Sequence, residues 1–327
     1  METMKRNPEA IARCVREAQT IAVVSHVNPD GDTLGSAAAM RLILTALGKE
    51  VTLFCDGEVP DQLAFLPGAD LFRFPTENDG PFDLMLAMDV SDVKRLGSAA
   101  VLLNRCRHTA QMDHHSTNPL YAEVNSVDGN APANCIQIRE LMDVLGVPVT
   151  KDIATCLYTG ISTDTGNFAF SSTNAETFRI MSDLMEHGLP LERLNRILFR
   201  VKSREQTKLL GKALESLRFR GDGKIAVITL TKKDFEDCGA TGQHADTIVN
   251  YGLDTKGTVM ALMARESADR QIKFSLRARD PYTVSDIAAR FGGGGHAQAA
   301  GITMAGPLEE CVEAVLREME KKAVSEE

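Results

Sequence analysis

Short strand-like runs alternate with helical patterns through the first half of this sequence, and this alternation is what most constrains the fold. Strand-like runs lie at 21–25, 51–55, 82–89 and 108–113. Helical patterns lie at 9–18, 33–48, 133–145, 151–162 and 175–187. Because neighbouring parallel strands are joined by long crossovers, usually helices, this order predicts an α/β fold with a parallel sheet.

A second alternation follows in the last third of the chain, after a charged helical segment. Its strands are expected at 225–230, 257–264 and 271–277, and its helices near 243–251 and 284–291. A length of 327 residues is comfortable for two domains. We therefore expect an N-terminal parallel-sheet domain over 1–189, a helical linker over 190–218, and a smaller α/β domain with a mixed sheet over 219–327.

Side chains that can bind metals or carry protons follow three of the first four strand-like runs. His26 follows the run IAVVS, Asp89 ends the run FDLMLAMD, and the triplet at 113–115 (Asp-His-His) ends the fourth. Ligands of parallel α/β sheets collect beyond the carboxyl ends of the strands. Carboxylates and imidazoles gathered there are suited to divalent cations. The pattern therefore predicts a metal centre at this edge of the sheet.

Three further aspartates lie in turn-like segments and have alternative structural interpretations. Asp30 and Asp32 lie in NPDGD, where they could form the turn and cap the next helix. Asp164 lies in STDTGNF, where it could cap a helix or close an Asx turn. Asp89 could merely begin a loop. These interpretations leave the histidines unexplained, so a metal centre is favoured for the set as a whole.

The segment FGGGGHAQAAG (291–301) is the clearest feature of the second alternation. Consecutive glycines lose much backbone entropy on folding, but they let a chain approach a ligand closely and direct N–H groups at an anion. A flexible hinge is the alternative interpretation. Just upstream, the period of a strand places Arg277 and Arg279 on one face, either as a solvated surface or as a phosphate contact. We favour contact with an anion or a nucleotide.

Composition excludes several classes of function. A formal net charge of −9 argues against a wide basic surface for long nucleic acids, although a local site can still bind phosphate. The chain has no Trp and 5% aromatic residues, so a long base-stacking channel is not supported. Seven cysteines without a C-x-x-C spacing indicate a reducing environment. No run has the length of a membrane span or the pattern of a signal peptide, so we expect a cytoplasmic protein.

The motifs taken together resemble those of the DHH phosphoesterase superfamily, which is named for a triplet like the one at 113–115. HVNPDGD, AMD, MDHH and TDTGNF match its four N-terminal motifs in order, and the segment from FSLRARD to GGGGHAQAAG looks like its DHH-associated C-terminal domain. The resemblance covers nearly the whole chain. The two-domain layout is most similar to the bifunctional oligoribonucleases that also act as 3′-phosphoadenosine 5′-phosphate (pAp) phosphatases.

The resemblance implies roles for particular residues. Two divalent metal ions, Mn²⁺ in most of the family, would be held by His26, Asp30, Asp32, Asp89, His114 and Asp164. Asp89 would bridge the two ions. His115 would contact the scissile phosphate or the leaving oxygen, and Asp113 would orient a histidine. The distal phosphate or sugar would be bound by Arg277, Gly293, Gly294, Gly295 and His296.

The implied function is hydrolysis of short oligoribonucleotides to mononucleotides and dephosphorylation of pAp to AMP. Long nucleic acids and membranes are not expected as partners, and the frequent dimers of the family leave a homodimer open. One alternative is a phosphodiesterase for linear or cyclic dinucleotides such as pApA and cyclic di-AMP. Another is a nucleotide sensor without catalysis, which the complete set of six ligands disfavours.

Overall fold

The computed structural model describes residues 5–267 and 271–325, and the chain divides into two units. Unit 1 is Met1–Val201 and unit 2 is Lys202–Glu327. The segment expected to be a linker, 190–218, is shared between them. Helix α6 (Leu191–Asn195) and the π-helical turn η4 (Arg196–Arg200) belong to unit 1, whereas α7 (Arg204–Glu215) belongs to unit 2.

Unit 1 is built on a five-stranded, wholly parallel sheet with the order β2-β1-β3-β4-β5. Its strands are β1 (Thr20–Val24), β2 (Glu50–Phe54), β3 (Phe82–Met88), β4 (Cys106–Asp113) and β5 (Val124–Val127). The predicted parallel sheet is confirmed, with β5 as an additional edge strand. The sequence of β5, VNSV, is too short and polar to show a strand pattern.

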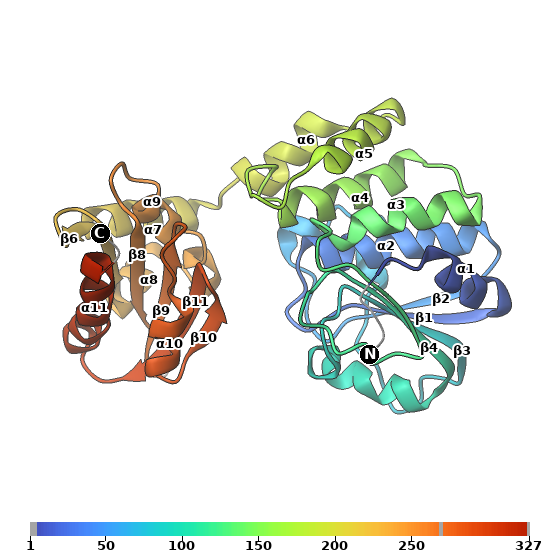
Figure 1. Ribbon diagram of the computed structural model, residues 1–327, viewed down its shortest axis with the longest axis horizontal. Helices are drawn as coiled ribbons and strands as arrows, with labels where there is room; N and C mark the ends of the chain where they lie inside the picture. Colours follow the sequence, from blue (N-terminus) through green and yellow to red (C-terminus); the bar gives the residue numbers. More distant parts are fainter. Residues whose placement is uncertain (1–4, 268–270, 326–327) are drawn as a thin grey trace. The chain divides into compact units, whose positions relative to one another are not determined.

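Helices cover one face of this sheet, and a 3-10 segment covers the other (Figure 1). The helices are α1 (Pro8–Glu17), α2 (Gly31–Ala46), α3 (Asn134–Leu145) and α4 (Lys151–Asp164), with α5 (Ala175–Glu186) outside them. The 3-10 segment is η3 (Val93–Asn104), and two single turns are η1 (Asp61–Leu63) and η2 (Ala69–Leu71). Both faces of the sheet are covered, which explains the unbroken apolar run of β1. Val23 packs against the helices, and Val24 packs against η3 on the other face.

Glycines allow α2 and α4 to approach each other closely. A Cβ atom on Gly35 would lie 2.6 Å from the backbone oxygen of Cys156. A Cβ atom on Gly160 would lie 2.4 Å from Oδ1 of Asp32. The close approach of these helices therefore brings the N-terminal end of α2 beside the C-terminal end of α4.

Unit 2 contains a six-stranded mixed sheet with the order β10-β11-β9-β8-β7-β6, as predicted. Its strands are β6 (Arg218–Arg220), β7 (Ile225–Leu230), β8 (Met260–Glu266), β9 (Gln271–Ala278), β10 (Gly294–His296) and β11 (Ala299–Ala305). β7 and β8 are parallel, and the other pairs are antiparallel.

The two faces of this sheet are covered differently. One face packs on α10 (Ser285–Arg290) and α11 (Leu308–Ser325). On the other face α7, α8 (Lys232–Cys238), the turn η5 (Gly242–Ala245) and α9 (Val249–Leu253) cover mainly β7 and β8. On that second face Lys273 is exposed, whereas Ser275 and Arg277 are half-buried. The outer part of this face is thus accessible.

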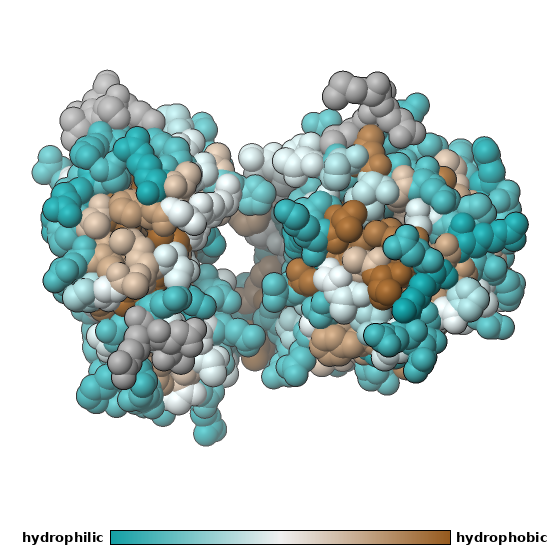
Figure 2. Space-filling view, turned by 90° about the horizontal axis from the view of Figure 1, so that it is seen from below, coloured by the Kyte–Doolittle hydropathy of each residue, from teal (hydrophilic) through white to brown (hydrophobic). Residues whose placement is uncertain are grey.

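On the face shown in Figure 2, most of the described surface is polar, and several apolar patches interrupt it. Within residues 5–267 and 271–325, no helix is both long enough and apolar enough to cross a membrane.

Candidate metal centre

The sheet of unit 1 brings the predicted strand-end residues together because β1, β3 and β4 are neighbours. His26 follows β1, Asp89 follows β3, and Asp113 is the last residue of β4. His26 Nε2 lies 3.7 Å from Asp89 Oδ2, and His114 Nε2 lies 3.4 Å from Asp89 Oδ1. The two oxygens of Asp89 therefore face two different histidines, which makes this carboxylate the centre of the cluster.

The N-terminal end of α2 contributes two carboxylates, and each also has a structural role. Oδ1 of Asp30 accepts hydrogen bonds from the N–H groups of Asp32 and Thr33, so it caps the helix. Its other oxygen, Oδ2, lies 3.5 Å from His26 Nε2. The capping interpretation is therefore right for Asp30, and it leaves Oδ2 available to a cation.

The fully buried Asp32 holds the start of α3. Its carboxylate accepts hydrogen bonds from the N–H groups of Asn134 at 2.5 Å and Cys135 at 3.1 Å. A carboxylate is favourable there because the N-terminus of a helix carries partial positive charge. Oδ2 also lies 3.9 Å from His114 Nε2. Asp32 thus links the cluster to the backbone of α3.

Asp164 is the last residue of α4, which ends two residues later than predicted. It cannot cap the N-terminus of this helix, and a carboxylate is unfavourable beside the negative end of a helix. Its Oδ2 lies 3.1 Å from His114 Nε2. This position favours a role in the cluster over a structural one.

The six predicted ligands form two groups of three. Ligand atoms of His26, Asp30 and Asp89 lie within 4.8 Å of one another, as do those of Asp32, His114 and Asp164. A third group within the same limit joins Asp89 to His114 and His115. The structure therefore brings all six predicted ligands into one cluster, with Asp89 at the junction.

The atoms of this cluster fit divalent cations. The Nδ1 atoms of His26 and His114 lie 2.8 and 3.0 Å from the backbone oxygens of Val27 and Ala131. Such bonds fix a ligand histidine so that its Nε2 lone pair points at the metal. Within the described residues, His26 Nε2 and Asp89 Oδ1 are buried and have no hydrogen-bond partner. Buried polar atoms of this kind are costly unless something binds them.

Charge in the cluster also requires compensation. Burial and the charges of the surrounding aspartates raise the pKa of Asp89 well above its usual range. Burial and the charge of Asp164 raise the pKa of Asp32 to about 7. Burial alone would lower the pKa of His114, but its hydrogen bond with Asp164 and the charge of Asp32 raise it to about 10. Bound cations would relieve this crowding of carboxylates.

A buried chain of hydrogen bonds lies behind His115. Its Nδ1 donates to Oδ1 of Asp113 at 2.8 Å, and Asn118 Nδ2 donates to Oδ2 of Asp113 at 2.6 Å. The amide of Asn118 is paired in turn with the amide of Gln111, through bonds of 3.0 and 3.1 Å. These two amides could not be identified from the sequence, because a polar residue does not reveal its hydrogen-bond partner. Only the position of Asn118 just after the triplet could have drawn attention to it.

The predicted substrate-binding residues all lie in unit 2. On the sheet, Ala299 of β11 pairs with Arg277 on one side and with His296 on the other, so these residues share one row. Arg277 donates to the backbone oxygen of Leu276 at 3.0 Å. Burial lowers the pKa of Arg277, and the charge of Asp246 opposes that shift.

The glycine run forms the hairpin of β10 and β11, and three of its members have local reasons to be glycine. Gly292 has a φ of +73° and Gly295 a φ of +147°, values that other residues rarely adopt. A Cβ atom on Gly293 would lie 2.1 Å from the backbone oxygen of Gly301. Gly294 has open space around its Cα and no such constraint. The geometry of the hairpin is therefore sufficient to explain three of the four glycines, which the sequence alone suggested were there for contact with a ligand.

Fold and cluster together define an α/β protein with a carboxylate–histidine centre suited to a pair of divalent cations. Two family models match the chain: "DHH family, N-terminal domain" over residues 20–161 and "DHHA1 domain" over residues 201–325. The chain belongs to the DHH family, as the order of its motifs predicted.

Several relatives are similar over most of their length. The Thermus thermophilus "Bifunctional oligoribonuclease and PAP phosphatase NrnA" is 34% identical, over 90% of this chain and 88% of the relative. The Bacillus subtilis protein of the same name is 26% identical, over 90% of this chain and 92% of the relative. Among solved structures, an exopolyphosphatase-related protein from Bacteroides fragilis has a TM-score of 0.90 and 26% identity, covering 96% of this chain and 95% of that chain.

Proposed function

We propose that this protein is a divalent-metal-dependent phosphoesterase that cleaves short oligoribonucleotides to mononucleotides and removes the 3′-phosphate of pAp. The observation that carries the proposal is the cluster in which the buried Asp89 joins two groups of three candidate ligands. The names of the relatives from Thermus thermophilus and Bacillus subtilis support the choice of substrates.

The six ligand side chains would hold the cations, with Mn²⁺ as the proposed metal. Bound there, two cations would neutralise phosphate oxygens and make a water molecule more acidic. The carboxylate of Asp89, with one oxygen toward each group, would keep the two positions together. Asp32 would fix its group to the start of α3.

His115 is the proposed proton-carrying residue. Because Asp113 accepts from Nδ1, the other ring nitrogen, Nε2, is available to a substrate. The side chain of His115 is 24% exposed, compared with 15% for His114. From this position Nε2 would donate a hydrogen bond to a phosphate oxygen or a proton to the leaving oxygen. Asp113 and Asn118 would hold the ring in that orientation.

Unit 2 would bind the part of the substrate that is not cleaved. Arg277 offers a guanidinium, and the exposed His296 lies in the same row of the sheet. A guanidinium binds phosphate through paired hydrogen bonds. The negative net charge of the chain agrees with a substrate of few phosphates.

A panel of substrates tests the proposal. Purified protein, with its Mn²⁺ content measured, would be given a short RNA oligomer, pAp, pApA and cyclic di-AMP. Mononucleotide release from RNA together with phosphate release from pAp is the expected result. Cleavage of the dinucleotides alone would replace the proposal with a dinucleotide phosphodiesterase. Binding without turnover on any of the four would identify a nucleotide sensor.

A further inference from the structure

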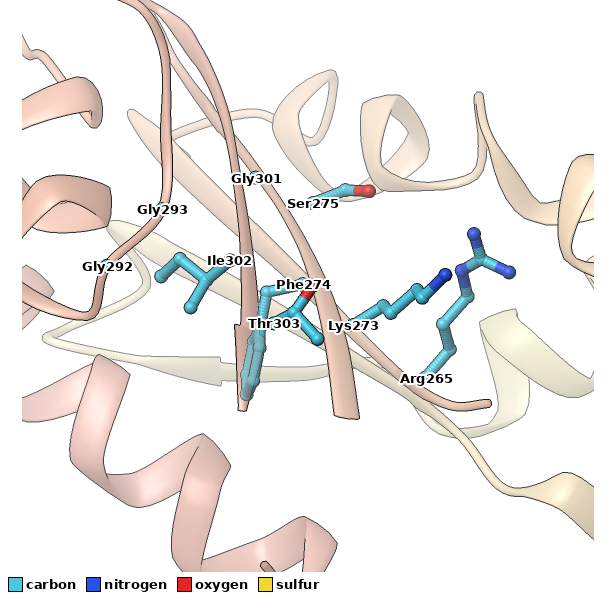
Figure 3. A pocket seen from close by; sticks show the side chains of 9 residues that line it. All are labelled: Arg265, Lys273, Phe274, Ser275, Gly292, Gly293, Gly301, Ile302 and Thr303. Carbon is cyan, nitrogen blue, oxygen red and sulfur yellow. The ribbon is translucent and has the colours of Figure 1, made fainter. Parts of the chain in front are cut away.

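A pocket opens on the accessible face of the sheet in unit 2 (Figure 3). Its volume is about 280 Å³, and its side chains come from β8, β9 and β11. The polar ones are Arg265, Lys273, Ser275 and Thr303, and Gly293 and Gly301 form part of its wall. In Figure 3, Arg265, Lys273 and Ser275 extend to the same side of the sheet.

Strand register places two cations directly opposite each other in this pocket. Arg265 of β8 pairs with Lys273 of β9, and Lys273 pairs in turn with Thr303 of β11. Like charges at directly opposite positions destabilise a sheet. Such a pair is understandable if an anion binds between the two side chains.

One carboxylate faces this pair of cations within residues 5–267 and 271–325, and it faces only Arg265. Oδ1 of the exposed Asp246 lies 4.0 Å from Nη2 of Arg265, and Lys273 has no ion pair within the described residues. Two cations with a single carboxylate leave a net positive charge in a chain whose net charge is −9. The pocket is therefore a local concentration of positive charge on an acidic protein.

The guanidinium of Arg265 is held in place. Its side chain is 19% exposed, and a Cβ atom on Gly242 would lie 2.0 Å from Nη1. The guanidinium thus lies against the bare backbone of η5. A guanidinium, an ammonium and two hydroxyl groups in one pocket are the donors that bind phosphate oxygens.

We propose that this pocket binds a phosphate of the oligonucleotide other than the one being cleaved. The inference rests on the proposed function and adds Arg265 and Lys273 to the substrate-binding residues. The pocket would favour substrates with two or more phosphates over those with one. Its contribution would be uniform binding, which raises KM when it is lost and leaves kcat nearly unchanged.

Kinetics of the full-length protein test the inference with two substrates. One is a 5′-phosphorylated RNA trimer, and the other is bis(p-nitrophenyl) phosphate, which has a single phosphate. We expect Lys273→Gln and Arg265→Gln each to raise KM for the trimer about 10-fold, the effect of one charged hydrogen bond. The ratio of kcat/KM for trimer over ester should fall by a similar factor. Lys256→Gln, an exposed lysine in the turn before β8, is the matched control for net charge.

Binding without turnover provides a second measurement. Anisotropy of a labelled RNA trimer, in EDTA, gives the dissociation constant as a function of salt. The double variant Arg265→Gln/Lys273→Gln should reduce the slope of log K against log salt by about 1.4, or ~0.7 for each lost phosphate contact. An active double variant with the wild-type KM and salt slope would overturn the proposal that this pocket binds phosphate. The same conclusion would follow if Lys256→Gln changed KM as much as Arg265→Gln or Lys273→Gln. A metal-loaded wild-type protein that leaves the trimer intact would instead refute the proposed function.

Discussion

Asp89 combines three properties that are rarely found in one aspartate. It is buried, its φ is +59°, and each of its oxygens faces a different histidine. A positive φ costs about 1 kcal/mol or more outside glycine, although Asp and Asn tolerate it best. The backbone and the charge are both unfavourable by themselves, so a bound partner is needed to explain why this residue is there.

Asp89→Asn is therefore a sharper test of the centre than a change to alanine. Asparagine keeps the shape and tolerates the positive φ, but it cannot bridge two cations. Activity should fall by more than about 100-fold, since even outer partners of metal sites cost ~10- to 100-fold. Burial and neighbouring carboxylates raise the pKa of Asp89, so an ionised Asp89 destabilises the folded state. The metal-free variant, which lacks this charge, should therefore melt at a higher temperature than the metal-free wild type.

Metal analysis, turnover and melting curves in EDTA check these outcomes. Asp70→Asn, at an exposed aspartate, is the matched control and should change none of them. Full activity in Asp89→Asn would show that the centre lies elsewhere.

His114 should make cation binding depend on pH. Its pKa of about 10 means that the imidazole is protonated at neutral pH in the metal-free protein. A cation on Nε2 must displace that proton, so affinity for Mn²⁺ should rise with pH between about 6 and 9. Calorimetric titrations in two buffers of different ionisation enthalpy measure the protons released. An affinity that does not change with pH would contradict this assignment.

Asn118 should affect turnover without holding metal. Asn118→Ala removes the hydrogen bond to Oδ2 of Asp113 and so loosens the orientation of His115. We expect kcat to fall about 10- to 100-fold at nearly constant KM, with metal content unchanged. Steady-state kinetics with metal analysis provide the test, and Asn104→Ala, at an exposed residue, is the control. A proportional loss of metal would instead make the residue a support for the ligands.

The candidate ligand residues could be named from the sequence, but the residues that support them could not. His26 and Asp89 could be identified because strand ends are visible as the ends of apolar runs. The pairing of Asn118 with Gln111 could not, because it depends on where β4 and the following loop lie in space. For Asp30, the two interpretations considered are compatible, since one oxygen caps α2 and the other faces His26.

At the level of elements, the approach of α2 to α4 determines the geometry of the centre. Gly35→Ala would place a Cβ atom 2.6 Å from the backbone oxygen of Cys156, which has little room to move. We expect this change to destabilise unit 1 by about 1–3 kcal/mol, as overpacked cores do. Urea denaturation followed by circular dichroism measures the effect.

Gly211→Ala in α7 is the corresponding control. Nothing lies within 4 Å of the Cβ atom that it would add. Alanine in an exposed helix stabilises by about 0.5–1 kcal/mol relative to glycine, so the two substitutions should have opposite signs. Equal and small effects would mean that α2 and α4 can separate without cost.

The predicted strands and helices were those with apolar runs or clear periodicity, and the unpredicted strands β5 and β10 lack both. Helix α11 was not predicted although its buried residues, such as Val312, Val315 and Met319, recur at helical spacing. β5 is polar and short, and β10 is the sequence GGH, which has no strand propensity. β10 forms because β11 pairs with it, and β11 in turn is held by β9. Pairing of this kind is a tertiary effect that local sequence patterns do not encode.

At the level of the whole molecule, each unit has hydrophobic clusters of its own. The clusters around Val23 and Val24 belong to unit 1, and those around Val227 and Ile228 belong to unit 2. Units with separate hydrophobic cores can unfold with different free energies. The two halves of the chain can therefore respond differently to one ligand.

Removal of divalent cations should destabilise unit 1 and leave unit 2 unchanged. All six predicted ligands lie in unit 1, and an ion at about 100 times its Kd stabilises the folded state by about 2.7 kcal/mol. Hydrogen exchange measured with and without EDTA separates the units, with β1 and β3 reporting on one and β7 and β8 on the other. Equal loss of protection in both would show that the cations act beyond unit 1.

The hairpin of β10 and β11 has a consequence for how this surface can change over time. At 293 a side chain would collide with a carbonyl oxygen, and at 295 the backbone itself excludes one. These two positions are therefore confined to glycine and offer natural selection almost no alternatives. Under the role proposed for the pocket, inherited variation in substrate preference has more freedom at Arg265 of β8 and Lys273 of β9 than at these two glycines.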